Sequence, residues 1–500
     1  MQEKINQYIS LRRKITAISY AINVINFDSQ TIAPIGCFEG RNKNFEVLAE
    51  MLYSVLKSEE YIKIVNDLYA NKDHLSLNMK KEIEKVHKDL QRDLLVPSNE
   101  QIEYDILLAN ATNAWAIAKE KNDYSIFSPY LEKIINYNKK YIDYIKTDKL
   151  TGYNILLDIY EEGTSISFYD EFFKELRKEI VPLVKKINEK RKTYNKDLIE
   201  NEFDINVQKD FSEYLMDVMC FDKTRGLKAE SEHPFTSSFN TTDVRITNHY
   251  YEDNLISSIF SIIHEGGHGL YELQCNKELD ETMIAGGTSM ALHESQSRFY
   301  ENIVGRSYSF WNKHYAKLKT MFKKELKNVT LDDFYNFVNR VECSLIRTEA
   351  DELTYPLHIM VRYELEKAIF NNEVTVDELP KKWNELYKEY LGIDVPDDSQ
   401  GILQDVHWSG GSFGYFPTYA LGSAYASQFY YSMSKDIDTI KEFGSDNLDV
   451  VNKWLGEKIH RHNGVKTPEE VLLYSTGEKF NSKYYIKYLK EKYTKIYNLD

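Results

Sequence analysis

The sequence has few cysteines, prolines and glycines, and it lacks long hydrophobic runs. Its four cysteines (Cys37, Cys220, Cys275 and Cys343) lie far apart and form no CxxC pair, which indicates free thiols in a reducing cytoplasm rather than a disulfide framework. The 10 prolines and 21 glycines leave long uninterrupted stretches that can form helices. The apolar run at 255–263 is far too short to span a membrane.

Basic charge is also scarce. The 63 basic residues are outnumbered by 78 acidic ones, for a net charge of −15, and this balance disfavours binding to a polyanion. The first residues lead to Arg12-Arg13-Lys14 without an apolar segment, so we expect no secretory signal peptide. We therefore expect a cytoplasmic protein with neither a nucleic-acid nor a membrane partner.

Apolar residues recur mostly at helical intervals, for example between positions 131 and 145. The alternation Asp243-Val244-Arg245-Ile246-Thr247 predicts a short strand, and the glycines and aromatics between 397 and 419 predict a loop. We therefore predict a mainly α fold with a small β-sheet. We expect a single domain over 1–500, with a helical N-terminal lobe (1–200) and a catalytic portion (201–500).

The motif His264-Glu265-Gly266-Gly267-His268 is the strongest chemical signal in the chain. Four residues of an α-helix turn the chain by about 400°, so the two histidines project from one face, one turn apart. That spacing suits two imidazole ligands of one metal ion, and Glu265 can reach a bound water without being a ligand. The two glycines are tolerable in a helix if bulk there would obstruct the floor of a cleft.

A third ligand would distinguish a metal site from a chance match to this pattern. The metzincin subclass needs a histidine where Gln274 stands. A glutamate zincin takes its third ligand from a following helix, and Glu294 lies in such a segment after a break at 286–289. Two histidines, one glutamate and an open position describe a catalytic zinc site, although cobalt and manganese accept the same ligands. We predict one ion per chain, bound by His264, His268 and Glu294.

These ligands predict hydrolysis of a peptide bond. A metal-activated water attacks the scissile carbonyl, and Glu265 takes its proton as general base and passes it to the leaving amine. The developing oxyanion needs a donor besides the metal. His407, Tyr415 and Tyr419 of the glycine-rich stretch are our candidates, with aromatic packing as the alternative role of the tyrosines.

Seven motifs stand in order along the chain: His233-Pro234-Phe235, Asp243 to Thr247, the metal helix, His293-Glu294-Ser295-Gln296, Ile346-Arg347-Thr348-Glu349-Ala350-Asp351, Gly401 to Trp408, and Gly414 to Tyr419. Together and in this order they resemble the motifs of the Taq-type metallocarboxypeptidases, a family of HExxH enzymes. Gly266 is one mild departure, because a larger residue is common there, and it should not affect ligation.

The resemblance implies a two-lobed helical zincin with a deep active-site cleft and a small sheet near the metal helix. It implies release of single C-terminal amino acids from peptides with a free C-terminus, with broad specificity, by a homodimer. The family's ligands correspond to His264, His268 and Glu294, and its general base to Glu265. Arg347 corresponds to the residue thought to bind the substrate's terminal carboxylate.

This role of Arg347 also has a physical reason, because a guanidinium binds a carboxylate through two parallel hydrogen bonds. The alternative is a structural network with Glu349 or Asp351, and Arg245 is the competing candidate for the carboxylate. His233, in an expected turn, either lines the cleft or is structural.

Two other functions would retain the same motifs. A cytosolic zinc oligopeptidase would cut internal bonds with the same metal machinery. A catalytically silent binding scaffold would normally have lost the base or a ligand, and all of these residues are present.

Overall fold

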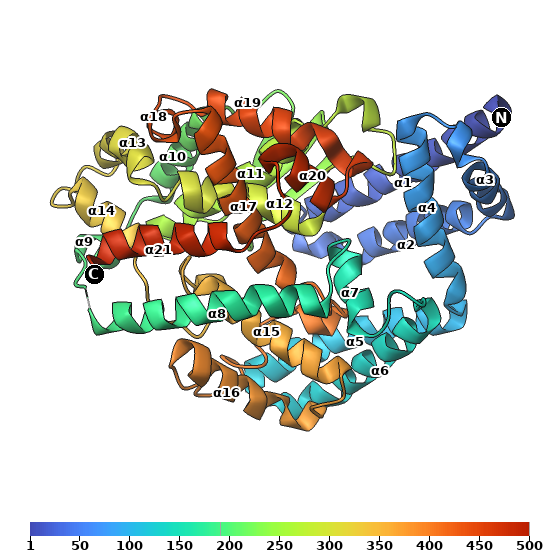
Figure 1. The fold of residues 1–500 in the computed structure, drawn as a ribbon, viewed down its shortest axis with the longest axis horizontal. Coiled ribbons are helices and arrows are strands. Elements are labelled where there is room, and N and C mark those ends of the chain that lie inside the picture. Colours follow the sequence, from blue (N-terminus) through green and yellow to red (C-terminus); the bar gives the residue numbers. More distant parts are fainter. Residues whose placement is uncertain (191, 500) are drawn as a thin grey trace.

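The computed structural model describes residues 1–190 and 192–499, and it confirms the mainly α class with a small sheet (Figure 1). Within these ranges, no helix combines the length and the hydropathy needed to cross a bilayer. The helices before residue 201 are α1 (Gln2–Thr31), α2 (Phe38–Leu56), α3 (Glu59–Ala70), α4 (Leu77–Leu95), α5 (Ser98–Lys121), α6 (Ser128–Ile145), α7 (Tyr153–Tyr160), α8 (Ile166–Glu189) and α9 (Asp197–Glu200).

The second part of the chain carries the sheet and the remaining helices. Its strands are β1 (Gly226–Glu230), β2 (Thr236–Asn240) and β3 (Asp243–Asn248). Its helices are α10 (Ile205–Val218), α11 (Leu255–Leu273), α12 (Met290–Arg298), the π-helix η5 (Phe299–Val304), α13 (Tyr308–Met321), α14 (Leu331–Val338), α15 (Tyr355–Phe370), α16 (Leu379–Leu391), the 3-10 turn η8 (His407–Gly410), α17 (Pro417–Asp436), α18 (Thr439–Phe443), α19 (Asp449–Lys458), α20 (Pro468–Thr476) and α21 (Lys483–Tyr497).

The sheet has the order β1-β3-β2, with β1 parallel and β2 antiparallel to the central strand β3. The predicted alternation is confirmed, because Val244 and Ile246 of β3 are fully buried while Arg245 between them is only half-buried. Strands β2 and β3 pack on α11. The sheet therefore lies beside the helix that carries the predicted metal motif.

Buried hydrophobic side chains form two clusters in the described part of the chain. The smaller one joins α1, α3 and α4 (blue in Figure 1). The larger one runs from Ala111 of α5 to Tyr497 of α21. The clusters thus divide near residue 100, and the expected division into lobes at residue 200 stays a prediction.

Helix α11 is stabilised at its start by a capping residue and along its length by the burial of its side chains. The side chain of Asn254 caps it by accepting a hydrogen bond from the Ser257 amide. Most of its side chains, including Ile259, Ile262 and Ile263, are buried. Helix α12 begins in the same way, with Ser289 accepting from the Leu292 amide.

Helix α12 is wedged between α11 and α17, with a glycine at each contact. A Cβ on Gly267 of α11 would lie 2.8 Å from the Gln296 carbonyl oxygen of α12. A Cβ on Gly422 of α17 would lie 2.7 Å from Cβ and Cγ of Glu294. Only a residue without a side chain permits these approaches.

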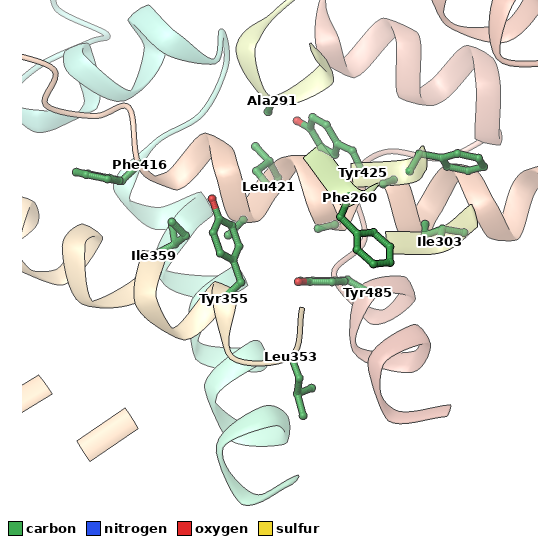
Figure 2. Close-up of a cluster of buried hydrophobic side chains, with 14 of the residues drawn as sticks. Phe260, Ala291, Ile303, Leu353, Tyr355, Ile359, Phe416, Leu421, Tyr425 and Tyr485 are labelled. Carbon is green, nitrogen blue, oxygen red and sulfur yellow. The ribbon is translucent and has the colours of Figure 1, made fainter. Parts of the chain in front are cut away.

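Helices α11, α12 and α17 also contribute side chains to one buried hydrophobic cluster. Figure 2 shows Phe260 of α11, Ala291 of α12, Leu421 of α17 and Tyr485 of α21 around it, with Tyr355 of α15 at its side. All five residues are buried. The site described next therefore rests on a packed core rather than on loops alone.

Candidate active site

His264, His268 and Glu294 are brought together by the pairing of α11 with α12. One ligand atom from each lies within 4.8 Å of the others. Nε2 of His264 is 4.0 Å and Nε2 of His268 is 3.5 Å from Oε2 of Glu294. Bonds of about 2.0–2.2 Å around a tetrahedral ion place ligand atoms roughly 3.4 Å apart. The residues present therefore fit a divalent metal with two nitrogen donors and one carboxylate.

Both histidines are oriented through their Nδ1 atoms. Nδ1 of His264 lies 2.8 Å from Oε2 of Glu301. Nδ1 of His268 lies 2.6 Å from Nδ1 of His293, whose Nε2 lies 2.8 Å from Oε1 of Glu272. With Nδ1 engaged, Nε2 of each ring is the atom left for the metal.

The surroundings of Glu294 and His268 favour the protonation states that bind a metal, whereas those of His264 do not. Burial would lower the pKa of His264, but its hydrogen bond with Glu301 and the charge of Glu294 raise it above its ordinary value. Burial alone would raise the pKa of Glu294, but Arg298, 2.6 Å away, and the two histidines hold it well below its ordinary value. Burial lowers the pKa of His268 to about 4. A charged carboxylate and a neutral imidazole are the forms that bind a metal.

Glu265 follows His264 on α11 and is itself buried. Its Oε2 accepts a hydrogen bond of 2.6 Å from the hydroxyl of Thr236, at the start of β2. Burial raises the pKa of Glu265, while His264 and Thr236 act in the opposite direction. The small sheet thus supplies the group that fixes the rotamer of this carboxylate.

A second group of predicted residues gathers around Arg347, which is buried. Its Nε and Nη2 donate to Oδ1 of Asp405 at 3.0 and 2.8 Å, and Oδ2 of Asp405 accepts from Nε of Arg362 at 2.7 Å. The expected alternative partners, Glu349 and Asp351, are therefore not the ones it binds. Burial would lower the pKa of Arg347, but Asp405 raises it above its ordinary value.

His407, Tyr415 and Tyr419 lie together beside this arginine. The Arg347 guanidinium carbon lies 5.2 Å from the Tyr419 ring centroid, Nε2 of His407 is 3.3 Å from the Tyr419 hydroxyl, and the Tyr415 and Tyr419 rings meet edge to face. Burial, followed by the Arg347 charge, lowers the pKa of His407 to about 4. Burial also raises the pKa of Tyr415 to about 12.

Tyr355 links this group to the metal ligands. Its hydroxyl lies 3.4 Å from Nη1 of Arg347, and its ring lies under the guanidinium of Arg298, which donates to Glu294. The Glu294 charge also adds to the raised pKa of Tyr415. The two groups therefore form one continuous site.

Two predicted residues lie apart from these contacts. The side chain of His233 is exposed, in the turn before β2. Arg245 donates to both oxygens of Asp243, at 2.8 and 2.9 Å, and its guanidinium stacks on Phe27 and Phe239.

Sequence reasoning missed the groups that contact the His264–His268–Glu294 cluster and the 407–415 loop. Glu301 lies seven positions after Glu294, a spacing that could have marked it as a neighbour on one helix face. No sequence spacing relates Glu366 of α15 to the other residues of the site. Glu366 is fully buried, and it accepts from Trp408 Nε1 and from the Gly414 amide, both at 2.7 Å. It thereby ties both ends of the loop between His407 and Tyr415.

Comparison with known proteins agrees with this geometry. The family model described as carboxypeptidase Taq (M32) metallopeptidase matches residues 7–493. Carboxypeptidase 1 of Bacillus subtilis is 40% identical over 496 residues, which cover 99% of this chain and 98% of that protein. Thermostable carboxypeptidase 1 of Pyrococcus furiosus is 35% identical, with 98% of each chain covered.

The crystal structure of an M32 carboxypeptidase from Deinococcus radiodurans R1 superposes with a TM-score of 0.95 at 29% identity, over 99% of this chain and 100% of that one. The resemblance to this family is therefore confirmed across nearly the whole length. The chain belongs to the carboxypeptidase Taq (M32) family and is a metallocarboxypeptidase.

Proposed function

We propose that this metallocarboxypeptidase releases single C-terminal amino acids by hydrolysis at the site formed by α11, α12 and the 407–419 segment. One observation carries the proposal: the ligand triangle and the buried Arg347 group are joined by side-chain contacts through Arg298 and Tyr355. A scissile carbonyl near the ligands would place the terminal carboxylate within reach of an arginine. We assign His233 and Arg245 no role in the hydrolysis.

We propose zinc as the ion, one per chain, held by His264, His268 and Glu294. Two nitrogens and one carboxylate with an open position match catalytic zinc sites, while cobalt and manganese are accepted by the same donors. When bound, the ion supplies Lewis acidity toward a carbonyl oxygen and lowers the pKa of water.

Glu265 is the proposed general base. It lies next to a ligand in sequence, it is buried, and its Oε2 is held by Thr236. Its pKa is raised by burial, which suits a carboxylate that first accepts the proton of the attacking water and then delivers it to the leaving amine.

Arg347 is the proposed site of the substrate carboxylate. Nε and Nη2 are occupied by Asp405, whereas Nη1 has, among the described residues, only the long contact of 3.4 Å to the Tyr355 hydroxyl. That donor can turn to a substrate oxygen at little cost. His407 adds a second open group, because its Nδ1 is buried and has no hydrogen-bond partner among the residues described.

Tyr415, Tyr419 and His407 are the proposed donors to the carbonyl oxygen as it becomes negatively charged. Their pKa shifts keep the phenols protonated and the imidazole neutral near pH 7. Donors of this kind act best when they are fixed before the reaction.

Hydrolysis of one peptide as the free acid and as the C-terminal amide tests the proposal. We expect the free acid to lose its last residue and the amide to be resistant, and undiminished cleavage of the amide would favour an oligopeptidase. Glu265→Gln should retain the metal and lose turnover, whereas a wild-type rate would remove Glu265 from the mechanism. Arg347→Ala should lower kcat/KM for the free acid.

We further propose a homodimer, which light scattering would test. We also propose a cytoplasmic location, since Cys37, Cys220, Cys275 and Cys343 are all free thiols. The division into a helical lobe (1–200) and a catalytic portion (201–500) is retained as a proposal that limited proteolysis can test.

A further inference from the structure

His268 and His293 share a contact that permits only one arrangement of protons. Their Nδ1 atoms are 2.6 Å apart, a distance at which two N–H groups facing each other would repel and two bare nitrogens would gain nothing. One ring must donate and the other must accept. A single proton therefore lies between the two imidazoles.

The proposed role of His268 as a metal ligand would decide which ring donates. Nε2 of His268 faces Glu294 at 3.5 Å and needs a lone pair to bind the ion, so the proton of this ring is on Nδ1. Nδ1 of His293 then accepts, and its own proton is on Nε2. That proton is donated to Oε1 of Glu272 at 2.8 Å. Donation thus runs outward in one direction, from His268 through His293 to Glu272.

Glu272 is fixed at the far end of this chain. It lies one turn after His268 on α11 and is buried. Its Oε1 also accepts from the Gly287 amide at 2.9 Å, in the segment that leads into α12. The carboxylate therefore ties the end of the metal helix to the approach of the helix that carries Glu294.

The two histidine ligands are supported differently. Glu301 contacts His264 directly and is shared with Arg298 and Arg306. Glu272 reaches His268 only through a second imidazole. Rotation of His293 would therefore release the His268 ring, whereas His264 has no such intermediate.

We propose that His293 and Glu272 are positioning residues that act in series to hold His268 in its Nδ1-protonated tautomer with Nε2 directed at the metal. This inference rests on the proposed ligand set. Partners of this kind commonly change metal affinity by about 10–100-fold when removed. His293→Ala should therefore weaken metal binding by about 10–100-fold, and Glu272→Gln should weaken it in the same direction.

The test is a double-mutant cycle on metal affinity, measured with Zn²⁺ by competition with a chelator and with Co²⁺ by visible absorption. Glu272 acts on His268 through His293, and a glutamine keeps a side-chain oxygen that can accept from the Gly287 amide. Glu272→Gln should therefore have no further effect in the His293→Ala background. His293→Gln, whose amide oxygen can accept from Nδ1 of His268, should restore part of the affinity. Tyr271→Phe is the matched control, since its hydroxyl bonds Thr288 and only its ring contacts His293.

Each outcome is decisive. Additive effects, or His293→Ala with wild-type affinity, would overturn the series arrangement. His268→Ala separates this failure from failure of the ligand set, because wild-type affinity in that variant would remove His268 as a ligand altogether. Circular dichroism of the metal-free variants checks folding. Should His293→Ala fail to fold, Glu272→Gln alone must still lower the affinity for the inference to stand.

Discussion

Replacing Gly267 by alanine tests how closely the two ligand-bearing helices must approach. The new Cβ would lie 2.8 Å from the Gln296 carbonyl oxygen and 2.8 Å from Cα of Ser297. Both are backbone atoms of α12, so no side chain can rotate away. Helix α12 would have to move by about half an ångström to reach ordinary van der Waals separation, and Glu294 would move with it.

The expected magnitude follows from two opposing terms. Overpacking a buried contact costs about 1–3 kcal/mol, while exchanging glycine for alanine inside a helix returns about 0.5–1 kcal/mol. We therefore expect Gly267→Ala to lower the free energy of unfolding by up to about 2.5 kcal/mol. Metal affinity should fall as well, because the distance between Glu294 and His268 changes.

Gly266→Ala is the matched control on the adjacent residue. Its Cβ would meet only Cε and Sδ of Met219, at 2.7 and 2.9 Å, and the end of this flexible side chain can move. We expect unchanged or higher stability and unchanged metal affinity. Urea unfolding of the metal-free proteins and chelator competition measure both quantities. A Gly267→Ala protein as stable and as tightly metal-binding as wild type, or a larger loss in Gly266→Ala, would refute the reasoning.

The remaining predictions concern the 407–415 loop, the loss of stability at low pH, and the pairing of Arg347 with Asp405. Glu366→Gln should lower stability by about 1–3 kcal/mol, because one buried loop donor loses its acceptor, and Trp408→Phe should raise KM more than it lowers kcat. Steady-state kinetics with both variants check this, and wild-type constants in both would contradict the role of Glu366 in holding the loop. Burial lowers the pKa of His460 from 6.5 to about 3, so its contribution to stability is full above pH 6.5 and is lost as the pH falls toward 3. On acidification, the unfolding free energy of His460→Gln should therefore fall less steeply than that of the wild type, by up to about 1.4 kcal/mol per pH unit. Parallel curves of unfolding free energy against pH for the two proteins would contradict the role of His460. Asp405→Asn should cost about 3–5 kcal/mol in urea unfolding, because Arg347 loses its buried counter-charge, and a cost below that of a surface pair would show that the charge is not needed.

The clustering of His264, His268 and Glu294 could be predicted from the sequence because their geometry is mostly local. His264 and His268 are brought together by the helical repeat alone, whatever the rest of the chain does. Glu294 required knowledge of glutamate zincins, since its distance from the histidines depends on how α11 packs on α12. The helix at 131–145 and the strand at 243–247 were likewise specified by local periodicity, and both are confirmed.

The groups around the ligands could not be predicted, because they come from unrelated segments. Thr236 reaches Glu265 across 29 residues of sequence, and Asp405 reaches Arg347 across 58. Contacts between residues this far apart follow neither the helical nor the strand periodicity, so no pattern in the sequence indicates them. The 397–419 segment was expected to be a loop throughout, yet α17 begins within it at Pro417, where a proline at the first turn needs no hydrogen-bond partner.

The pairing of Arg347 and Arg362 with Asp405 has a consequence for the proposed binding of the substrate carboxylate. Asp405 stays charged, because the two guanidinium groups hold its pKa well below its ordinary value despite burial. Two guanidinium cations and one carboxylate together carry a surplus of one positive charge. A single terminal carboxylate cancels that surplus, whereas a phosphate dianion would leave an uncompensated negative charge in a buried place. An amidated or internal peptide segment brings no charge and leaves the surplus unbalanced. With Arg347 in its proposed role, the charge of the bound group would therefore matter as well as its shape, and Asp405 would set the charge that the site prefers.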